Sequence, residues 1–200
     1  LFNGTTEFDH TSYDVFLKNF KYKFKNETKE NGGFIKIKKE KLEFFIDVGN
    51  PPPNIFSNNY QAGCLAFEFL SNGQKIICNS GYAKHFPNLS LISCSTAAHS
   101  TLYLNDRSSC IFEKNKIIRK IYGNSLVQQH RILSKNLEEN EKYYLISASH
   151  NGFEKKSGYL HKRSVKIYKK QNKIIGEDEL KKTKSYPSLV NYSIRFYVYP

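Results

Sequence analysis

Hydrophobic side chains recur at every second position along much of this chain, which is the period of a β-strand with one buried face. Phe20–Phe24 alternates aromatic residues with lysines, and Ser193–Tyr199 alternates in the same way. This period differs from the 3.6-residue period of a helix, so it argues against a mostly helical fold. Further strands are predicted at Phe34–Ile37, Leu42–Val48, Leu65–Phe69, Ile76–Cys78, Thr101–Leu104, Ile117–Tyr122, Leu126–Leu133, Tyr143–Ser149 and Tyr159–Tyr168.

Turn residues separate these segments at short intervals. Asn31–Gly33 and Ser71–Gln74 supply the positive φ angles that tight turns need, and Pro51–Pro53 ends a strand because proline cannot donate to a ladder. Helix is expected only at Asp9–Phe20 and for a single turn at Glu177–Lys182. No internal repeat and no linker is visible. The sequence therefore predicts one all-β domain over residues 1–200, a large antiparallel β-sandwich.

The ends and the hydrophobic runs of the chain bear on its cellular context. No stretch approaches the ~18 consecutive apolar residues of a membrane helix, and no signal peptide is visible. The chain begins with Leu1 in the sequence LFNGT, which does not resemble the start of a complete protein. We therefore expect a piece of a longer or processed protein.

The formal net charge of +13 indicates an anionic partner: nucleic acid, an anionic membrane or an acidic polysaccharide. Codon bias of an AT-rich genome is the alternative cause, because Lys greatly outnumbers Arg and tryptophan is absent. Arginine is the side chain that binds phosphates and guanine edges in bidentate fashion. It occurs only at Arg107, Arg119, Arg131, Arg163 and Arg195, so nucleic acid is not expected as a partner.

The cysteines do not indicate a metal or redox motif. Cys64, Cys78, Cys94 and Cys110 form no CxxC pair, so a zinc knuckle is not expected. A chain of this length does not need disulfides for stability, and Cys64 and Cys78 lie within apolar segments. Buried free thiols are the default expectation, with disulfides as the alternative.

Six motifs rich in turn residues, polar residues and histidine follow one another in a recognisable order. They are DVGNPPP (47–53), QAGCLAFEFLSNGQKIICNSG (61–81), STAAHSTLYL (95–104), SASHNGFEKKSGYLHKRSV (147–165), GEDEL (176–180) and RFYVYP (195–200). From LFNG onwards, this order resembles the C-terminal domain of heparinase II/III-like proteins, especially those of alphaproteobacteria. Each motif alone is weakly specific, and the ordered set is much more so.

The resemblance implies a fold, a partner and a reaction. Proteins of this family are similar in having an N-terminal α/α toroid followed by a large β-sandwich, with an acidic polysaccharide bound between them. The reaction implied is β-elimination at a uronic acid. It needs a group that neutralises the carboxylate, a base for the C5 proton and an acid for O4. Because no toroid is present in these residues, independent lyase activity of these residues alone is not expected. The resemblance also implies a periplasmic or extracellular location.

The family sandwich also implies a bound metal, which this sequence supports poorly. Asn59 and Gln61 precede the Ala62-Gly63 pair where the family tends to have His or Asp, and Asn79 replaces an Asp. Only His99, in an Ala-His pair, matches by type. Zinc prefers histidine, cysteine and carboxylate, and calcium prefers charged oxygen ligands. We therefore expect no cofactor, with zinc or calcium at a degenerate site as the alternative.

The candidate site residues follow from these motifs. They are His99, His150 and His161 as catalytic groups, Arg163, Asn59 and Gln61 as substrate ligands, and His99 with Asn79 as the ligands of the alternative metal site. Each has a structural alternative. His99 could tie a loop, His150 could stabilise a turn, and His161 with Arg163 could lie on a solvated sheet face. His130 has no companion at useful spacing and is expected to be a surface or structural residue, and the adjacent acids at 177–178 are expected to cap a turn.

Three functions remain open from the sequence alone. The first is the β-sandwich domain of a polysaccharide lyase that assists β-elimination together with an α/α toroid. The second is a non-catalytic carbohydrate-binding module, which the many tyrosines favour. The third is a basic scaffold or nucleic-acid binder, which rests on charge alone and is disfavoured by the scattered arginines.

Overall fold

The fold is seen in a computed structural model, which describes residues 10–22, 29–81, 86–185 and 190–200. The LFNG motif and the second half of the predicted Phe20–Phe24 strand lie outside these residues. No helix among the described residues is long and apolar enough to cross a membrane.

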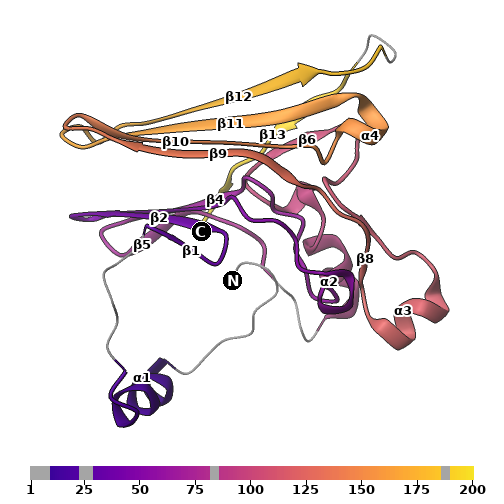
Figure 1. Cartoon of the computed structure of the whole chain (residues 1–200), viewed down its shortest axis with the longest axis horizontal. Helices are drawn as coiled ribbons and strands as arrows, with labels where there is room; N and C mark the ends of the chain where they lie inside the picture. Colours follow the sequence, from indigo (N-terminus) through magenta and orange to yellow (C-terminus); the bar gives the residue numbers. More distant parts are fainter. Residues whose placement is uncertain (1–9, 23–28, 82–85, 186–189) are drawn as a thin grey trace.

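Two antiparallel sheets face each other as the layers of a sandwich (Figure 1). One has six strands in the order β1-β2-β3-β4-β5-β14, and the other has four in the order β12-β11-β10-β9. The predicted all-β sandwich is thereby confirmed. The strands are β1 (Glu30–Asn31), β2 (Phe34–Lys39), β3 (Leu42–Asp47), β4 (Phe67–Ser71), β5 (Gln74–Cys78), β9 (Ile132–Glu139), β10 (Tyr143–His150), β11 (Tyr159–Tyr168), β12 (Ile174–Lys182) and β14 (Tyr197–Val198).

The main core lies between the inner faces of these two sheets. Ile35 of β2 and Phe44 of β3 meet Ile146 of β10 and Ile167 of β11, and all four side chains are fully buried. In β11 every second residue from His161 to Ile167 is buried, which is the period seen in the sequence. Burial of apolar surface, worth roughly 25 cal/mol per Å², therefore fixes the register of each strand.

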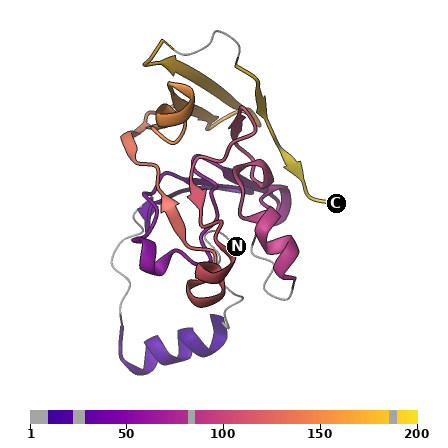
Figure 2. The same ribbon diagram turned by 90° about the vertical axis from the view of Figure 1, so that its right-hand side faces the viewer.

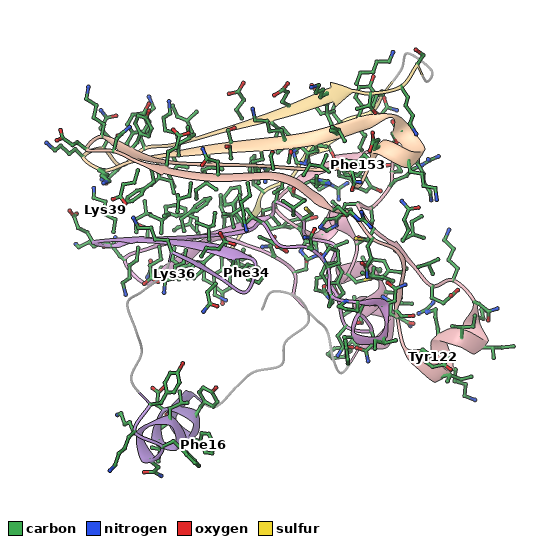
Figure 3. All side chains as sticks on the ribbon, viewed as in Figure 1. Phe16, Phe34, Lys36, Lys39, Tyr122 and Phe153 are labelled. Carbon is green, nitrogen blue, oxygen red and sulfur yellow. The ribbon has the colours of Figure 1, made fainter. Side chains whose placement is uncertain are left out.

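The smaller elements gather mainly at one end of the sandwich, where Figure 1 shows α2, α3 and α4, and Figure 2 looks onto this end. Helix α1 lies apart from the sheets, as the labelled Phe16 shows in Figure 3. The elements are α1 (His10–Asn19), η2 (Asn54–Phe56), α2 (Pro87–Ser93), η3 (Thr96–Ala98), α3 (Lys116–Tyr122) and α4 (Glu154–Ser157), with the paired strands β6 (Leu102–Leu104) and β13 (Tyr192–Ile194), and β7 (Ile111–Phe112) and β8 (Leu126–Gln128).

One predicted strand is a helix. Residues 117–122 belong to α3, because its two ends are capped in the sequence. The Asn115 side-chain oxygen accepts the N–H groups of Ile117 and Ile118 at 2.9 and 3.3 Å. Gly123 ends the helix with a φ of 71°, a conformation that glycine adopts without strain.

Several further predictions are wrong. The single strands predicted at Leu126–Leu133 and Ser193–Tyr199 are each divided between strands of two different sheets, β8 and β9 in the first and β13 and β14 in the second. The predicted helical turn at Glu177–Lys182 is part of strand β12, which pairs with β11 residue by residue. Phe20–Tyr22 is not a strand but the turn that ends α1, where the Phe20 N–H donates to the Phe16 carbonyl. The predicted helix at Asp9–Phe20 is confirmed by α1.

All four cysteines are free thiols, as expected by default, and three of them are buried.

Candidate functional site

Three histidines that are distant in sequence lie together inside the end of the sandwich near α4. His150 and His161 lie directly opposite each other on β10 and β11. His130, from the segment before β9, packs beside His150 with 5.5 Å between ring centroids. All three side chains are fully buried. The ring of Phe153, which is labelled in Figure 3, packs beside His150 with 5.4 Å between ring centroids. The structure therefore brings two of the predicted catalytic histidines together.

Hydrogen bonds determine which imidazole nitrogens carry protons. The Gly152 backbone N–H donates to Nδ1 of His150 at 3.0 Å, so this nitrogen is an acceptor. Nε2 of His150 then donates to Nδ1 of His161 at 3.0 Å, and Nε2 of His161 donates to Asp178 at 2.6 Å. Burial lowers the pKa of both histidines, that of His150 well below its usual range. Both imidazoles are therefore neutral.

Arg163 and Asp178 form a buried ion pair at the other end of this chain of hydrogen bonds. Nε and one terminal nitrogen of Arg163 donate to the two carboxylate oxygens at 2.8 and 2.9 Å. The other terminal nitrogen donates to the carbonyls of Leu65 and Ser100 at 2.8 and 2.9 Å. Burial alone would raise the pKa of Asp178, but hydrogen bonds from His161 and Arg163 lower it to about 2. The bidentate partner of Arg163 is thus a carboxylate of its own chain.

His130 forms a second pair with the thiol of Cys110. Because the Gly49 carbonyl can only accept, Nε2 of His130 donates to it at 3.4 Å and Nδ1 accepts the S–H of Cys110 at 3.1 Å. Burial raises the pKa of Cys110 to about 12 and lowers that of His130 to about 4. The thiol stays neutral, so this pair does not have the thiolate of an activated nucleophile.

His99 directly precedes Ser100, whose carbonyl accepts a hydrogen bond from Arg163. The His99 ring packs on Gly63, where an added Cβ would lie 3.2 Å from His99 Cγ. Burial lowers the pKa of His99 to about 4, and its Nε2 has no hydrogen-bond partner among the described residues. The Ser100 N–H donates to the side-chain oxygen of Asn79 at 2.7 Å. Asn79 is therefore hydrogen-bonded to the backbone of the residue that follows His99.

The described residues do not fit a zinc site at this position. The Asn79 oxygen already accepts from Ser100, and its amide nitrogen lies 3.4 Å from the Phe67 carbonyl. The described part of the chain contains no group of three or more histidine, cysteine, aspartate or glutamate side chains that could hold a metal. A single imidazole with amide oxygens is a poor ligand set for zinc. Metal binding through His99 and Asn79 stays a sequence prediction.

Asn59 and Gln61, the predicted substrate ligands, lie on the loop that leads to Gly63. Gln61 is buried, and its amide nitrogen donates to the Asn59 carbonyl at 3.1 Å. Its amide oxygen has no partner among the described residues. Asn59 is half-buried. Gln61 shares with His99 a buried polar atom without a partner in the described chain, and their roles stay predictions.

A polar pocket of about 220 Å³ opens at the same end of the molecule. One of its residues, Gln129, directly precedes the buried His130, and another, Asn151, directly follows the buried His150. This pocket, called the amide-lysine pocket below, combines amide groups that can bind hydroxyls with two ammonium groups that attract anions and one carboxylate, that of Glu154. Its lining residues are Gln128, Gln129, Asn151, Glu154, Lys155 and Lys184.

A larger groove of about 960 Å³ lies between the two sheets, on the side of β12 and β5. Its walls are largely apolar, including Phe67, Phe69 and Phe196, and Arg163 and Asp178 lie on its inner wall. Ion pairs between Lys29 and Glu139 and between Lys135 and Glu30 link the two sheets on the other side. The histidine network thus runs from the amide-lysine pocket to this groove.

Sequence reasoning missed two members of the network. Asp178 was expected to cap a turn, but it lies in β12 directly opposite Arg163. His130 was expected to be a surface or structural residue without companions, but it is buried and contacts Cys110 and His150. A signal for Asp178 exists in the sequence, because Arg163 and Asp178 are equally far from the turn between β11 and β12. No comparable local signal marks His130.

Comparison with protein families identifies the chain. A family model described as Heparinase II/III-like, C-terminal matches residues 27–200. The chain belongs to the heparinase II/III-like family. The predicted resemblance is thereby confirmed. Comparison with curated proteins found no match.

Solved structures of heparinases share the fold of this family member. A heparan sulfate lyase HepC mutant from Pedobacter heparinus aligns over 86% of this chain and 27% of its own, with 16% identity and a TM-score of 0.57. A heparinase III with methylated lysines aligns over 90% of this chain and 29% of its own, with 16% identity and a TM-score of 0.61. A further heparinase III aligns over 91% and 30%, with 13% identity and a TM-score of 0.61. This chain therefore spans less than a third of the length of these proteins.

Proposed function

We propose that this domain binds acidic polysaccharide at the amide-lysine pocket and assists β-elimination of uronic acid residues together with an N-terminal α/α toroid of the same protein. The observation that carries the proposal is the pocket itself. Lys155 and Lys184 approach it from α4 and from the segment after β12, and neither ammonium group has an ion-pair partner among the described residues. The membership of the heparinase II/III-like family supports the same assignment.

The pocket chemistry suits a uronic acid residue. Lysine provides a compact positive charge that would attract and partly neutralise the uronate carboxylate. Neutralising that carboxylate makes the adjacent C5 proton easier to remove, which is the first requirement of β-elimination. The amide of Gln128 offers a donor and an acceptor for sugar hydroxyls. Asn151 offers its amide nitrogen as a donor, because its side-chain oxygen accepts the Arg131 N–H at 2.7 Å. This chain would therefore contribute binding and charge neutralisation.

The buried histidines would act on the pocket indirectly. Nδ1 of His150 accepts the Gly152 N–H, so removing a substrate proton would require this hydrogen bond to break. The same bond holds the turn that carries Asn151, Glu154 and Lys155. We therefore assign His150 and His161 a positioning role. This role differs from the direct catalysis by His99, His150 and His161 that the sequence predicted, and that prediction stays untested.

A non-catalytic carbohydrate-binding module is the second candidate. It is favoured by the burial of the three predicted catalytic histidines, whose side chains are each no more than 3% exposed. In this case the pocket would hold the polysaccharide without assisting its cleavage. The two candidates differ in whether an unsaturated uronate product is formed.

The test measures binding and product formation with heparan sulfate, alginate and hyaluronan, and with neutral dextran. Removing two charges by Lys155→Ala with Lys184→Ala should weaken binding of acidic glycans by about tenfold or more, because about 1.4 kcal/mol of attraction corresponds to that factor. The matched control is Lys170→Ala with Lys181→Ala, which removes the same charge from exposed positions away from the pocket. Equal losses in both variants would contradict the assignment of the pocket. Ultraviolet absorbance of unsaturated uronate, from this chain and from the protein with its N-terminal part, separates the two candidates.

A further inference from the structure

Two tyrosines and two lysines lie close together on the four-stranded sheet, at the end of the sheet opposite α4. Tyr143 and Tyr168 lie directly opposite each other on β10 and β11, edge to face, with 6.2 Å between ring centroids. The Lys166 ammonium lies 4.7 Å from the Tyr143 ring centroid, and the Lys173 ammonium lies 5.7 Å from that of Tyr168. We call these four residues the tyrosine-lysine patch. In Figure 1 this is the end at which a hairpin joins β11 to β12.

Strand alternation places the patch on the outer face of the sheet. Ile167 is fully buried between the two sheets, so its neighbours Lys166 and Tyr168 point outward. Tyr143 pairs with Tyr168 on one side, and the Tyr168 N–H donates to the Lys173 carbonyl at 3.1 Å on the other. The patch is therefore built on paired strands, which hold its side chains in a fixed order.

The polar groups of the patch are available to a ligand. Among the described residues, neither of its ammonium groups has an ion-pair partner, and neither of its phenol hydroxyls has a hydrogen-bond partner. The inner face differs, because the Lys169 ammonium contacts both the Tyr144 ring and the Glu139 carboxylate. Contact with a ring restricts each lysine of the patch, so less conformational freedom is lost when it binds a ligand.

The charges of the two central strands favour an anionic ligand. Strands β10 and β11 contain no acidic residue, and β11 directs Lys162 and Lys166 outward. The acidic side chains around them lie on the edge strands β9 and β12 or in the hairpin between β9 and β10: Glu138, Glu141, Glu177 and Glu179. An anionic chain that follows the central strands would therefore lie over cations, with the acids to its sides.

The rest of the outer face fits a glycan better than an apolar protein surface. From the patch toward α4, β10 presents Leu145, Ser147 and Ser149 outward, and β11 presents Ser164. The Ser149 hydroxyl is hydrogen-bonded to that of Ser134 on β9 at 2.6 Å. The centre of a protein interface is usually apolar and aromatic. Small side chains with hydroxyl groups instead leave a flat surface on which sugar hydroxyls find hydrogen-bond partners.

We propose that the tyrosine-lysine patch is a second binding site for acidic polysaccharide, where the ammonium groups bind carboxylate or sulfate groups and the phenol hydroxyls bind sugar hydroxyls. The inference rests on the proposed function, because it adds a second contact for the ligand class of the amide-lysine pocket. Tyr143 begins β10, and Asn151 of the pocket follows its last residue. At about 3.3 Å per residue the two sites are roughly 26 Å apart. A chain of several sugar residues held at both sites binds more tightly than at either alone.

The experiment measures the affinity of this chain for heparan sulfate, alginate and hyaluronan. Lys166→Ala with Tyr143→Phe removes one ammonium and one hydroxyl from the patch and keeps the ring. Binding of the polysaccharide that the parent chain binds most tightly should weaken by about tenfold, because a hydrogen bond to a charged group accounts for such a factor. The matched control is Lys75→Ala with Tyr199→Phe, since the Lys75 ammonium lies 5.8 Å from the Tyr199 ring centroid on the other sheet. Equal losses in both variants, or no loss in the patch variant, would overturn the proposal.

A combination with Lys155→Ala and Lys184→Ala separates the patch from the pocket. Binding that remains in the pocket variant should be abolished when Lys166→Ala and Tyr143→Phe are added. A loss in the patch variant but not in the pocket variant would refute only the assignment of the pocket. A loss in the pocket variant alone would refute only the patch. Absence of binding to all three polysaccharides would refute both, and binding of duplex DNA in their place, weakened in the patch variant, would overturn the proposal in favour of nucleic acid.

Discussion

Gly152 is enclosed by groups that leave no room for a side chain. An added Cβ would lie 2.7 Å from the Ser109 carbonyl oxygen and 2.9 Å from Nδ1 of His150. We expect Gly152→Ala to lower the free energy of unfolding by about 2–3 kcal/mol, because both the backbone of Ser109 and the imidazole would have to move. Urea unfolding measures the change. The control is Gly176→Ala, where no atom lies within 4 Å of the added Cβ, and an equal loss there would contradict the explanation.

Asp178 and Glu179 allow a comparison of two neighbouring acids on one strand. Asp178→Ala removes the partner of the buried Arg163 and His161, and we expect a loss of about 3–5 kcal/mol in the free energy of unfolding. Glu179 is exposed and lies 3.8 Å from Lys162, so Glu179→Ala should cost about 1 kcal/mol or less. Thermal and urea denaturation of both variants provide the measurement. Similar losses would show that the buried pair is not held as described.

The polar network shows how far residue roles could be predicted from the sequence. His150, His161 and Arg163 were predicted from their motifs, and the structure places them together. Their burial is indicated by alternation, because His161 and Arg163 share a strand face with the apolar Val165 and Ile167. The sequence did not show their partner: Asp178, across the strand pair, compensates the burial of Arg163 and His161.

Strand elements were predictable where the period extended over enough residues. The segments that became β2, β3, β10 and β11 were expected close to their observed bounds. Helices α2 and α3 each have seven residues, which is too short to display a helical period. The isoleucines of α3 also favour strands by intrinsic propensity. The cap residues at its two ends, and not its hydrophobic pattern, were the available signal.

The cap of α3 can be tested directly. Asn115→Ala removes the acceptor for the N–H groups of Ile117 and Ile118, and we expect a loss of about 1 kcal/mol in the free energy of unfolding. Hydrogen exchange of these two amides should accelerate more than exchange in β10. Asn115→Asp should retain the cap, because aspartate is as good an acceptor at this position. Equal stability of Asn115→Ala and the parent chain would show that α3 does not depend on its cap.

At the scale of the whole molecule, the sandwich was predictable because two sheets with one apolar face each must bury those faces together. The grouping of α2, α3 and α4 at one end was not, because it depends on contacts between loops that are distant in sequence. The bond from Leu126 to Ser57 is one such contact. The amide-lysine pocket arises from this grouping. The residues that line it were therefore absent from the predicted site.

Two kinds of buried titratable group make the free energy of unfolding depend on pH in opposite directions. The folded-state pKa is lowered for His99, His130, His150 and His161, to about 4 for the first two, by burial. Their contribution to stability is present above the unfolded pKa of about 6.5 and is lost as pH falls toward 4. Asp47 is opposite, because burial raises its pKa to about 7. Its contribution is present below about pH 4 and is lost as pH rises through 7.

Because four histidines oppose one aspartate, we expect the free energy of unfolding to increase between about pH 4 and 6.5. Asp47→Asn removes the opposing group while keeping an acceptor for the Gly49 N–H, which donates to Asp47 at 3.0 Å. Relative to the parent chain, this variant should gain stability as pH rises from about 4 to 8, by a few kcal/mol at most, since one pKa unit corresponds to about 1.4 kcal/mol. Urea unfolding across this range measures both curves. Parallel curves for the two proteins would show that Asp47 keeps an ordinary pKa in the folded state.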